Sequence, residues 1–251
     1  MKERRDAIRR YIELHGEVSI AELAREFNSW SEMTIRRDLD FLADSRAVIL
    51  TRGGARRMPS SFGISEDVYS ERETRNADSK RQLALKAASL IEPGTGIFID
   101  AGTTAMALAR VLPDYSNVVV VSAPNIALEI AVNKAKPNII LLGGALSRRA
   151  MSVSDPEAER QLANLNIDTA FLATSGFDED AGFSVGSKAD AMLKRAVIAR
   201  SRRVVMLLDS SKIGAAMPFT FARPEEVDLL VTDNGIPPAV RKKLEMKTKI
   251  L

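Results

Sequence analysis

Cysteine is absent from this chain of 251 residues, and His15 is its only histidine. Without cysteine the chain can form no disulfide, thiolate nucleophile or cysteine-based metal site. Histidine is the side chain that enzymes use most often for proton transfer, but His15 precedes Gly16 at the end of a predicted helix, where it would cap the carboxyl end. A catalytic site would have to use carboxylates, lysines and hydroxyls, and we expect no catalytic residue, no metal site and no cofactor.

Long apolar runs and a strong net charge are also absent. No stretch approaches the ~20 apolar residues that cross a bilayer, and the amino-terminal MKERRDAIRRYIELHG lacks the apolar core of a signal peptide. The net charge is only +3, so any electrostatic signal must come from local patterning. We therefore expect a cytoplasmic protein without a membrane partner.

What the sequence does contain is, first, a pattern of three helices and a hairpin. Ser19 and Glu22 form a capping box, and Ser31 caps a third helix after a short break. The predicted elements are helices over 4–14, from Ser19 and from Ser31, a strand over 47–50 and a turn over 52–55. The three helices followed by a hairpin predict a winged helix-turn-helix domain over residues 1–57.

The third helix carries the charges that suggest a ligand. Its inward stripe is Ile35, Leu39 and Leu42, which turns Thr34, Arg37 and Asp38 outward and leaves Arg36 on a flank. Four arginines and no acid lie between residues 46 and 57, namely Arg46, Arg52, Arg56 and Arg57. A solvated helix face with Arg36 paired to Asp40 is the simpler alternative. The combination of helix order, cap and basic wing favours double-stranded DNA. The predicted DNA contacts are Ser31, Glu32, Thr34, Arg36, Arg37, Arg52, Gly53 and Arg56.

The rest of the chain has an α/β pattern. Residues 58–79 are polar and are predicted to be a linker that runs into a helix over 80–91. Short β-branched runs then alternate with helical segments to the end of the chain, which predicts a mostly parallel sheet covered on both faces over residues 80–251. The predicted strands cover 96–100, 118–122, 138–142, 169–173, 204–209 and 228–232. The predicted helices cover 104–112, 125–133, 156–164, 188–199 and 238–245.

Polar and glycine-rich segments follow several of these strands. DAGTT, residues 100–104, ends one strand and opens a helix, so its amides and hydroxyls suit phosphate. Ligands of open α/β sheets bind beyond the carboxyl ends of strands, so several such ends indicate one crevice. For any single one of them, an ordinary turn remains the alternative. The predicted ligand contacts are Asp100, Gly102, Thr103, Thr104, Ser122, Asn125, Gly143, Gly144, Ser175, Gly176, Lys188, Asp209 and Lys212.

Both halves resemble the DeoR family of bacterial transcription regulators. The run SEMTIRRDLDFL followed by TRGGA is similar to the family's recognition helix and wing, although Trp30 stands where valine is usual and the break is one residue longer. DAGTT, the Gly-Gly and Ser-Gly pairs and DSSKIG match the family's later landmarks. The resemblance covers essentially the whole chain.

The resemblance implies a fold and a function. The second domain would be similar to ribose-5-phosphate isomerase and CoA-transferase-like folds. The protein would be a homodimeric or homotetrameric repressor of a carbohydrate-utilisation operon, controlled by a phosphorylated sugar or related metabolite. Phosphate would lie on Gly102–Thr104 with Lys212 or Lys188 nearby. The segment GFSVGSKADA, residues 182–191, departs from the family's commoner acidic sequence, which indicates a different ligand.

The alternative is a sugar-phosphate isomerase-like enzyme fused to a DNA-binding domain. Such isomerases carry D-G-A-D-E where this chain reads Ser175-Gly176-Phe177-Asp178-Glu179, so the first aspartate is replaced by Ser175. Asp178 and Glu179 remain as candidate bases. Loss of the first carboxylate favours a site that binds without catalysis.

Overall fold

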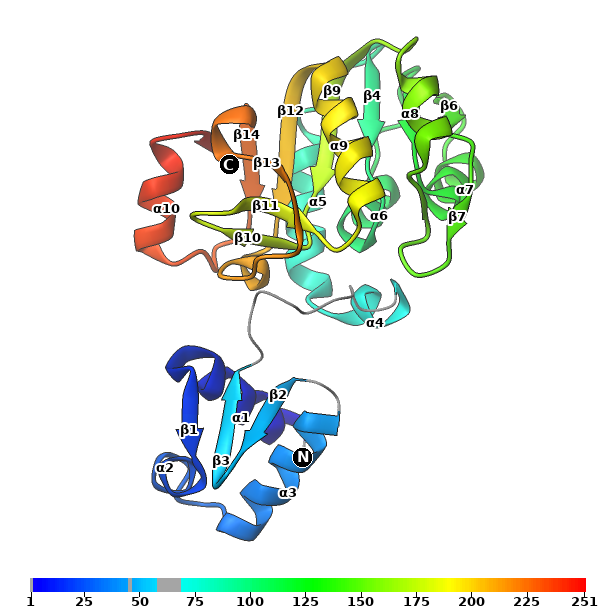
Figure 1. Ribbon diagram of the computed structural model, residues 1–251. Coiled ribbons are helices and arrows are strands. Elements are labelled where there is room, and N and C mark those ends of the chain that lie inside the picture. The colour runs from blue at the N-terminus through cyan, green and yellow to red at the C-terminus, as the bar shows by residue number, and fades with distance from the viewer. Residues whose placement is uncertain (1, 45–46, 58–68) are drawn as a thin grey trace. The chain divides into compact units, whose positions relative to one another are not determined.

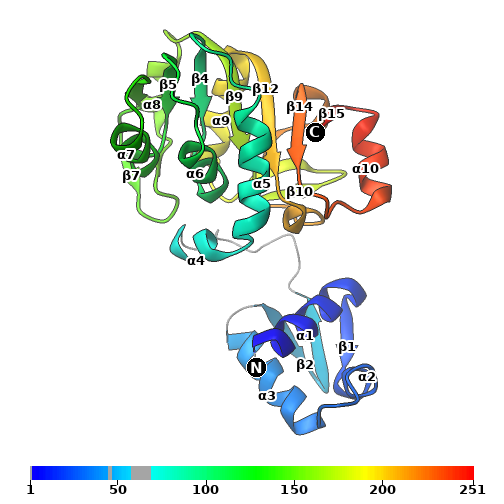
Figure 2. The same ribbon diagram turned by 180° about the vertical axis from the view of Figure 1, so that it is seen from behind.

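The computed structural model describes residues 2–44, 47–57 and 69–251, and the chain divides into two compact units, residues 1–63 and 64–251. Figures 1 and 2 draw the two units from opposite sides. The predicted linker, residues 58–79, lies outside the described residues as far as residue 68. Its remainder is helical, because α4 spans Tyr69–Thr74 and α5 spans Ala77–Ala88.

The first unit contains the predicted helices and hairpin. Its elements are α1 (Lys2–His15), β1 (Glu17–Ser19), α2 (Ile20–Glu26), α3 (Glu32–Asp44), β2 (Val48–Thr51) and β3 (Gly54–Arg57). The strands form an antiparallel sheet in the order β1-β3-β2. The strand β1 is missing from the prediction because three residues between two helices show no alternation that a pattern could detect.

The three predicted caps of this unit are confirmed. The Ser19 amide donates to Glu22 Oε2 at 2.7 Å, and the Glu22 amide donates to Ser19 Oγ at 3.2 Å. Ser31 Oγ accepts from the Thr34 amide at 3.3 Å. At the end of α1 the His15 Nδ1 lies 2.9 Å from the Tyr11 carbonyl oxygen. These bonds satisfy groups that a helix end leaves without intrahelical partners.

The core of the first unit is small and continuous. The predicted stripe of Ile35, Leu39 and Leu42 is buried, as expected. Trp30 is half-buried against this core and stacks on Phe27, with 4.7 Å between ring centroids. Trp30 is therefore a packing residue of the helix-turn-helix.

The second unit is built on a sheet of seven parallel strands in the order β15-β14-β12-β9-β4-β5-β6. Its strands are β4 (Gly96–Ile99), β5 (Val118–Val121), β6 (Asn138–Leu141), β9 (Ile167–Ala173), β12 (Ser201–Leu208), β14 (Leu229–Thr232) and β15 (Lys249–Ile250). Its longer helices after α5 are α6 (Thr103–Arg110), α7 (Pro124–Asn133), α8 (Pro156–Leu162), α9 (Lys188–Arg200) and α10 (Pro238–Glu245). The six predicted strands and five predicted helices are confirmed.

Helices cover both faces of this sheet, as the continuous apolar strands predict. Along β12, Val205 and Leu207 pack in one cluster with residues of α5, α6 and α7. Val204 and Met206 point to the other face and pack in a second cluster with residues of α8, α9 and α10. Figure 1 shows α8 and α9 in front of the sheet, and Figure 2 shows α5 and α6 in front of it from behind.

Several smaller elements are absent from the prediction. A second sheet, antiparallel and in the order β10-β11-β13, consists of β10 (Gly176–Asp178), β11 (Gly182–Val185) and β13 (Phe219–Ala222). The hairpin of β7 (Leu146–Ser147) and β8 (Ser152–Val153) and two short 3-10 helices, η1 (Ser210–Lys212) and η2 (Pro224–Glu226), complete the unit. These segments are too short for a hydrophobic period to separate them from loops.

Candidate functional site

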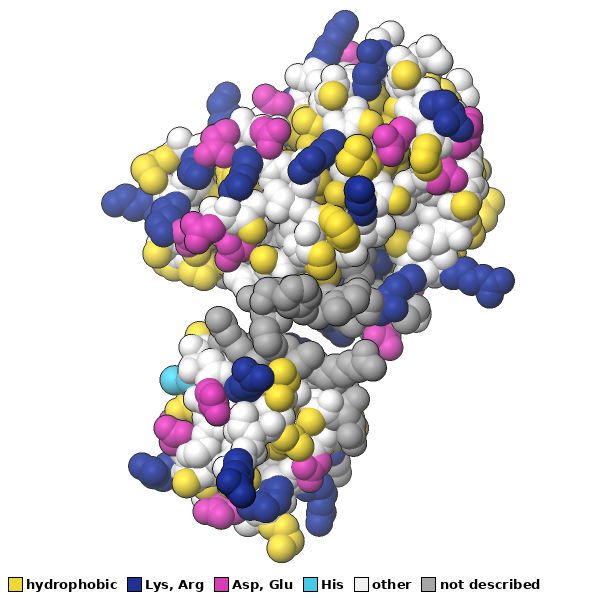
Figure 3. Space-filling view, viewed as in Figure 1, with side chains coloured by type: hydrophobic (Ala, Val, Ile, Leu, Met, Phe, Trp, Pro, Cys, Tyr) yellow, Lys and Arg dark blue, Asp and Glu magenta, His cyan; other side chains and the backbone are white. Residues whose placement is uncertain are grey.

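The predicted DNA-contacting residues lie on the exposed side of α3 and at the turn between β2 and β3. Ser31, Glu32, Arg36 and Arg37 are exposed, as are Arg52, Gly53 and Arg56, while Thr34 is half-buried. The Ser31 and Thr34 hydroxyls are hydrogen-bonded to each other at 2.9 Å. Figure 3 shows Lys and Arg side chains gathered at the end of the unit where α3 begins and the β2–β3 turn lies.

The arginines of this face are available to a ligand. The alternative pairing of Arg36 with Asp40 is not formed, and within the described ranges Arg36, Arg37, Arg52 and Arg56 make no ion pair. Arg46 lies outside the described residues, and so does the side chain of Arg57. Four exposed cations around a helix amino terminus match the phosphate backbone of DNA in charge.

One prediction for α3 is wrong. Asp38 does not point outward; its side chain is fully buried and accepts hydrogen bonds from the Nε atoms of Arg4 and Arg5, the latter at 2.8 Å. Burial acts to raise the pKa of Asp38, but the two guanidinium groups outweigh it and hold that pKa below its usual value. Asp38 therefore links α3 to α1. The helical-wheel prediction was wrong because α1 packs against the side of α3 on which Asp38 lies.

In the second unit, most of the predicted ligand residues follow carboxyl ends of the parallel strands. Since all seven strands are parallel, these ends meet at one edge of the sheet, and Figures 1 and 2 show α4 at that edge. Asp100 follows β4, Ser122 follows β5, and Asp209 follows β12. The structure thus brings the predicted segments toward one side of the unit.

Gly102 is the residue that opens this edge to a ligand. It caps α6 with φ +98°, a conformation that favours glycine. Gly102 is buried, but the nearest atom to a Cβ built at this position is Arg72 Nη1, 3.7 Å away, so there is room beside its backbone next to that guanidinium. The first amides of α6 and the hydroxyls of Thr103 and Thr104 follow directly. A helix amino terminus with an adjacent arginine is suited to bind an anion.

Cationic side chains surround this edge. The buried Lys80 of α5 donates from Nζ to the carbonyls of Arg72 and Arg75, the latter at 2.6 Å. Burial lowers the pKa of Lys80 from 10.5 to about 8, and the charges of Lys212, Arg72 and Arg75 act in the same direction. Asp209 opposes them. Asn76, the residue before α5, donates to Asp209 Oδ1 at 3.4 Å and to Ser211 Oγ at 2.9 Å, so the segment of Asp209 and Lys212 lies beside the start of α5.

A set of buried oxygens lies near the same strand ends. Asp100 is 1% exposed; its Oδ2 accepts from the Ala173 amide at 2.8 Å and is ion-paired with the buried Lys194 of α9. Its Oδ1, Ser122 Oγ and Asn125 Oδ1 form no hydrogen bond with any residue that the structure describes. Buried polar atoms are rarely left without partners, so these atoms could accept or donate hydrogen bonds to a polar ligand.

Three other predicted ligand residues are glycines that pack against neighbouring parts of the fold. The Gly143 amide donates to Gln161 Oε1 at 2.9 Å, and a Cβ on Gly144 would overlap the carboxylate of Asp155, the cap of α8. A Cβ on Gly176 would overlap the Ala215 carbonyl. These three positions thus have packing reasons that need no ligand.

The remaining predicted residues are either exposed or hydrogen-bonded to residues of neighbouring segments. Asp209 caps the 3-10 helix η1, accepting from the Ser211 amide at 3.1 Å. The Ser175 amide donates to the Ser184 carbonyl at 3.1 Å, beside the second sheet. Lys188 is exposed at the first position of α9. None of these contacts assigns a ligand to the three residues.

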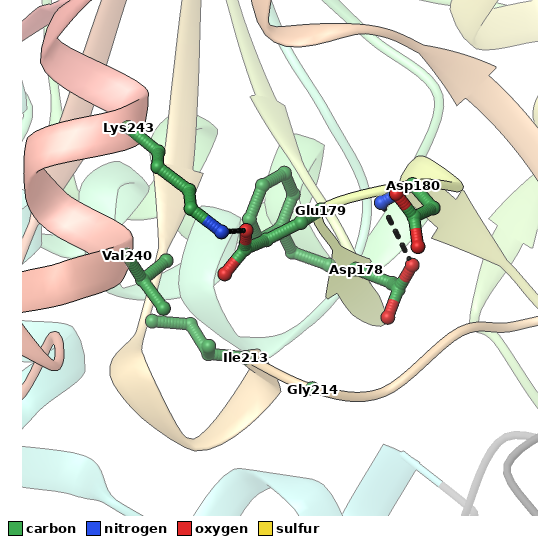
Figure 4. A pocket seen from close by; sticks show the side chains of 8 residues that line it. Asp178, Glu179, Asp180, Ile213, Gly214, Val240 and Lys243 are labelled. Carbon is green, nitrogen blue, oxygen red and sulfur yellow. Dashed lines mark hydrogen bonds and ion pairs between the residues drawn. The ribbon is translucent and has the colours of Figure 1, made fainter.

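Asp178 and Glu179, the candidate bases of the enzyme alternative, line a separate pocket of about 350 Å³ with Val240 and Lys243 of α10. Figure 4 shows Asp178 turned to the amide of Asp180, which donates to Asp178 Oδ1 at 2.9 Å. Glu179 is ion-paired with Lys243. Both carboxylates therefore serve the turn between β10 and β11, and Figure 1 shows that this turn points toward α10 rather than α6.

Four residues near these strand ends were not predicted from the sequence as site residues. Tyr69 and Arg72 belong to a segment whose polar composition predicts a linker, while Lys80 and Lys194 lie within helices as ordinary lysines of the pattern. The one available signal was the placement of Lys80 and Lys194 on the buried faces of their helices, because lysine is almost never buried without a partner.

A winged-helix unit joined to a parallel α/β unit with polar and cationic residues at one edge of its sheet defines a class of ligand-responsive DNA-binding proteins. Comparison with known proteins gives the family. Residues 4–61 match the DeoR-like helix-turn-helix domain, and residues 75–234 match the DeoR C terminal sensor domain. The chain therefore belongs to the DeoR family of helix-turn-helix transcriptional regulators.

Full-length relatives agree with this assignment. The chain is 35% identical over 245 residues to the HTH-type transcriptional regulator YulB of Bacillus subtilis, covering 98% of this chain and 93% of the relative. It is 32% identical over 243 residues to the glycerol-3-phosphate regulon repressor of Escherichia coli, covering 96% and 94%. Among solved structures, ribose 5-phosphate isomerase A of Methanocaldococcus jannaschii aligns over 55% of each chain with 17% identity and a TM-score of 0.41, a likeness from which nothing further is drawn.

No helix among residues 2–44, 47–57 and 69–251 combines the length and apolarity needed to cross a membrane. In the same ranges no group of three His, Asp or Glu side chains is placed to hold a metal ion.

Proposed function

We propose that this regulator is a repressor of a carbohydrate-utilisation operon, and that a phosphorylated sugar bound to the second unit changes its affinity for DNA. The observation that carries the proposal is the open amino terminus of α6 at Gly102, with Arg72 beside it and buried, unpartnered oxygens nearby. A phosphate would occupy the cationic end of this site, and sugar hydroxyls would partner the oxygens.

The first unit would supply operator recognition. The α3 helix enters the major groove, where Arg36 and Arg37 reach base edges or phosphates, and Arg52 at the β2–β3 turn contacts the adjacent backbone. The exposure of these arginines and their lack of ion pairs among the described residues support this docking. One winged helix reads one half-site, so a homodimer or homotetramer would bind a two-fold symmetric operator.

The phosphorylated carbohydrate is proposed on chemical grounds and on kinship. The name of the Escherichia coli relative assigns it to the glycerol-3-phosphate regulon. The site described above offers a helix terminus and cations for a phosphate, and hydroxyl, amide and carboxylate oxygens for a polyol. We place the ligand on Gly102, Thr103 and Thr104, with Lys212 contributing positive charge and Ser122 and Asn125 reading hydroxyls.

We further propose that the second unit binds its ligand without converting it. Aldose–ketose isomerisation needs a carboxylate base free to take a proton from the substrate. Asp178 and Glu179 are engaged by Asp180 and Lys243, and Ser175 stands where isomerases have an aspartate. Incubation with ribose 5-phosphate, followed by a colour assay for ketopentose, would detect turnover and overturn this part.

The regulator function is tested by DNA binding. A preferred duplex is first selected from random sequences by repeated binding to the full-length protein. Its affinity is then titrated with and without a panel of phosphorylated sugars and their unphosphorylated parents. We expect at least one phosphorylated compound to change the affinity by a factor of roughly 10, within the usual range of allosteric coupling. A duplex affinity that no phosphorylated compound changes would contradict the proposal.

A further inference from the structure

The short helix α4 is the first described element after the DNA-binding unit, and it lies at the ligand edge of the sheet (Figures 1 and 2). Several contacts hold it there. The Tyr69 amide donates to the Arg149 carbonyl at 3.3 Å, and Arg110 of α6 is ion-paired with Glu73 at 2.9 Å. At its carboxyl end, Lys80 donates to the Arg72 carbonyl. The helix is therefore part of the second unit and covers the beginning of α6.

Arg72 is the side chain of α4 that reaches the predicted phosphate position. Its Nη1 is the nearest atom to a Cβ placed on Gly102, at 3.7 Å. An anion on the α6 amides would therefore meet this guanidinium, which can donate two parallel hydrogen bonds to phosphate oxygens. Lys80 anchors the backbone of Arg72 and Arg75, so the cation is held in place by a second cation that is itself buried.

Tyr69, one turn earlier on the same helix, belongs to the hydroxyl end of the site. Its Oη is buried, and neither it nor Asn125 Oδ1 forms a hydrogen bond of ordinary geometry with the described residues, although Asn125 lies near the phenol. Burial raises the pKa of Tyr69, so the phenol remains a hydrogen-bond donor at neutral pH. Ser122 is 1% exposed, and its Oγ also lacks a hydrogen-bond partner among the described residues.

We propose that α4 reads the effector: Arg72 completes the phosphate site at Gly102–Thr104, and Tyr69, with Ser122 and Asn125, binds a hydroxyl group of the same ligand. This inference rests on the proposed function and extends it to the first described helix of the second unit. A ligand that engages both ends of α4 stabilises that helix against the sheet. Because α4 is the first described element after the DNA-binding unit, ligand occupancy acts on the described element of the second unit that is nearest in sequence to the operator-binding domain.

Two variants separate the two ends of the ligand. In the full-length chain, Arg72→Gln removes the phosphate donor and Tyr69→Phe removes only a hydroxyl. Arg81→Gln, an exposed arginine of α5, and Tyr115→Phe, an exposed tyrosine, are the matched controls. The affinity of each protein is measured by thermal-shift titration with inorganic phosphate and with glycerol 3-phosphate, after its melting temperature without ligand has shown that it folds.

We expect Arg72→Gln to lower the affinity for both probes by at least tenfold. Arg72→Lys should lower it less, because the lysine keeps the positive charge. Tyr69→Phe should leave the affinity for phosphate unchanged and lower the affinity for glycerol 3-phosphate by three- to tenfold. The two control variants should bind both probes with wild-type affinity. If Arg72→Gln binds both probes like the wild type while Gly102→Val does not, the α4 assignment is overturned and the proposed function stands. If neither probe nor any phosphorylated sugar stabilises the wild type, both are overturned.

Discussion

The DNA-binding face and the sensor site use charged residues in opposite ways. On α3 and the β2–β3 turn, Arg36, Arg37, Arg52 and Arg56 are exposed and make no ion pair with the described residues. At the ligand edge, Lys80, Asp100 and Lys194 are at most 6% exposed and are held by specific partners. Exposed cations bind a polyanion with little reorganisation but are screened by salt, whereas buried groups respond to a ligand that replaces missing partners.

The contrast predicts that substitutions on the two surfaces have different effects. Removing an exposed arginine should change affinity and leave folding intact, because the side chain has no partner to orphan. Removing one partner of a buried ion pair should destabilise the unit, because the other charge is left in a medium that cannot solvate it.

The largest effect is expected for Lys194→Met. Asp100 would keep the Ala173 amide but lose the cation that neutralises it, so the sensor unit should be destabilised by about 3–5 kcal/mol, the usual cost of breaking a buried pair. Urea denaturation followed by circular dichroism measures the change. Lys188→Met, an exposed lysine on the same helix, should be nearly neutral. Equal stability of both variants would contradict the claim that the buried ion pair of Asp100 and Lys194 stabilises the sensor unit.

For Arg37→Ala we expect operator binding to weaken by about 1–3 kcal/mol, with relaxed preference at one base pair, since a side chain that reads a base edge gives discrimination of that size. Fluorescence anisotropy with the selected duplex and its single-base variants measures both quantities. The melting temperature should stay at the wild-type value because the side chain is exposed. Unchanged binding to all the duplexes would remove Arg37 from the interface.

Arg52→Ala should act uniformly rather than specifically. A wing arginine that contacts phosphate releases about one counter-ion, so its loss should weaken selected and random duplexes alike and reduce the slope of log K against log salt by roughly one unit. Titrations at several salt concentrations give the slope. A loss confined to the selected duplex would instead mean that Arg52 reads sequence.

A different kind of effect, a dependence of stability on pH, is expected for Lys80. Its pKa is about 8 in the folded chain and 10.5 ordinarily, so the unfolded chain binds more protons between those values. The cost of burying the ammonium is fully present below pH 8, and the free energy of unfolding should rise as pH increases from about 8 to 10.5. Comparison with Lys80→Met isolates this contribution in urea titrations, since the variant should lack the rise. A variant with the same pH dependence as the wild type would contradict it.

Much of the fold could be predicted because its signals are local. Ser19, Ser31 and His15 cap helices within a few residues of their partners, and the parallel strands are short apolar runs. Asp38 could not be placed correctly because the residues that bury it, Arg4 and Arg5, lie 34 and 33 positions away. The packing of α1 on α3, and not the periodicity of α3, decides where that carboxylate points.

The sensor site was partly predictable for the same reason. The open glycine at Gly102 is visible as a strand-to-helix turn in the sequence. Arg72 and Tyr69 are not, because they approach that turn from a segment whose polar composition indicates a linker. Gly144 and Gly176 have a second explanation, since a glycine at a strand end can equally be required by the packing of a neighbouring backbone or side chain, and their ligand contacts stay predictions.

The central claim, that a phosphorylated ligand at the α6 amino terminus controls DNA binding, is tested most directly by Gly102→Val. A side chain there would occupy the space above the α6 amides and conflict with φ +98°, while β4 ends before it. The affinity for the selected operator is measured in wild type and variant, with a phosphorylated sugar that changes wild-type binding and with its unphosphorylated parent. The account predicts that the variant binds the operator normally without ligand but no longer responds, and that the parent sugar has no effect on either protein. A variant that keeps the full response, or a parent sugar that acts as strongly as its phosphate, would contradict it.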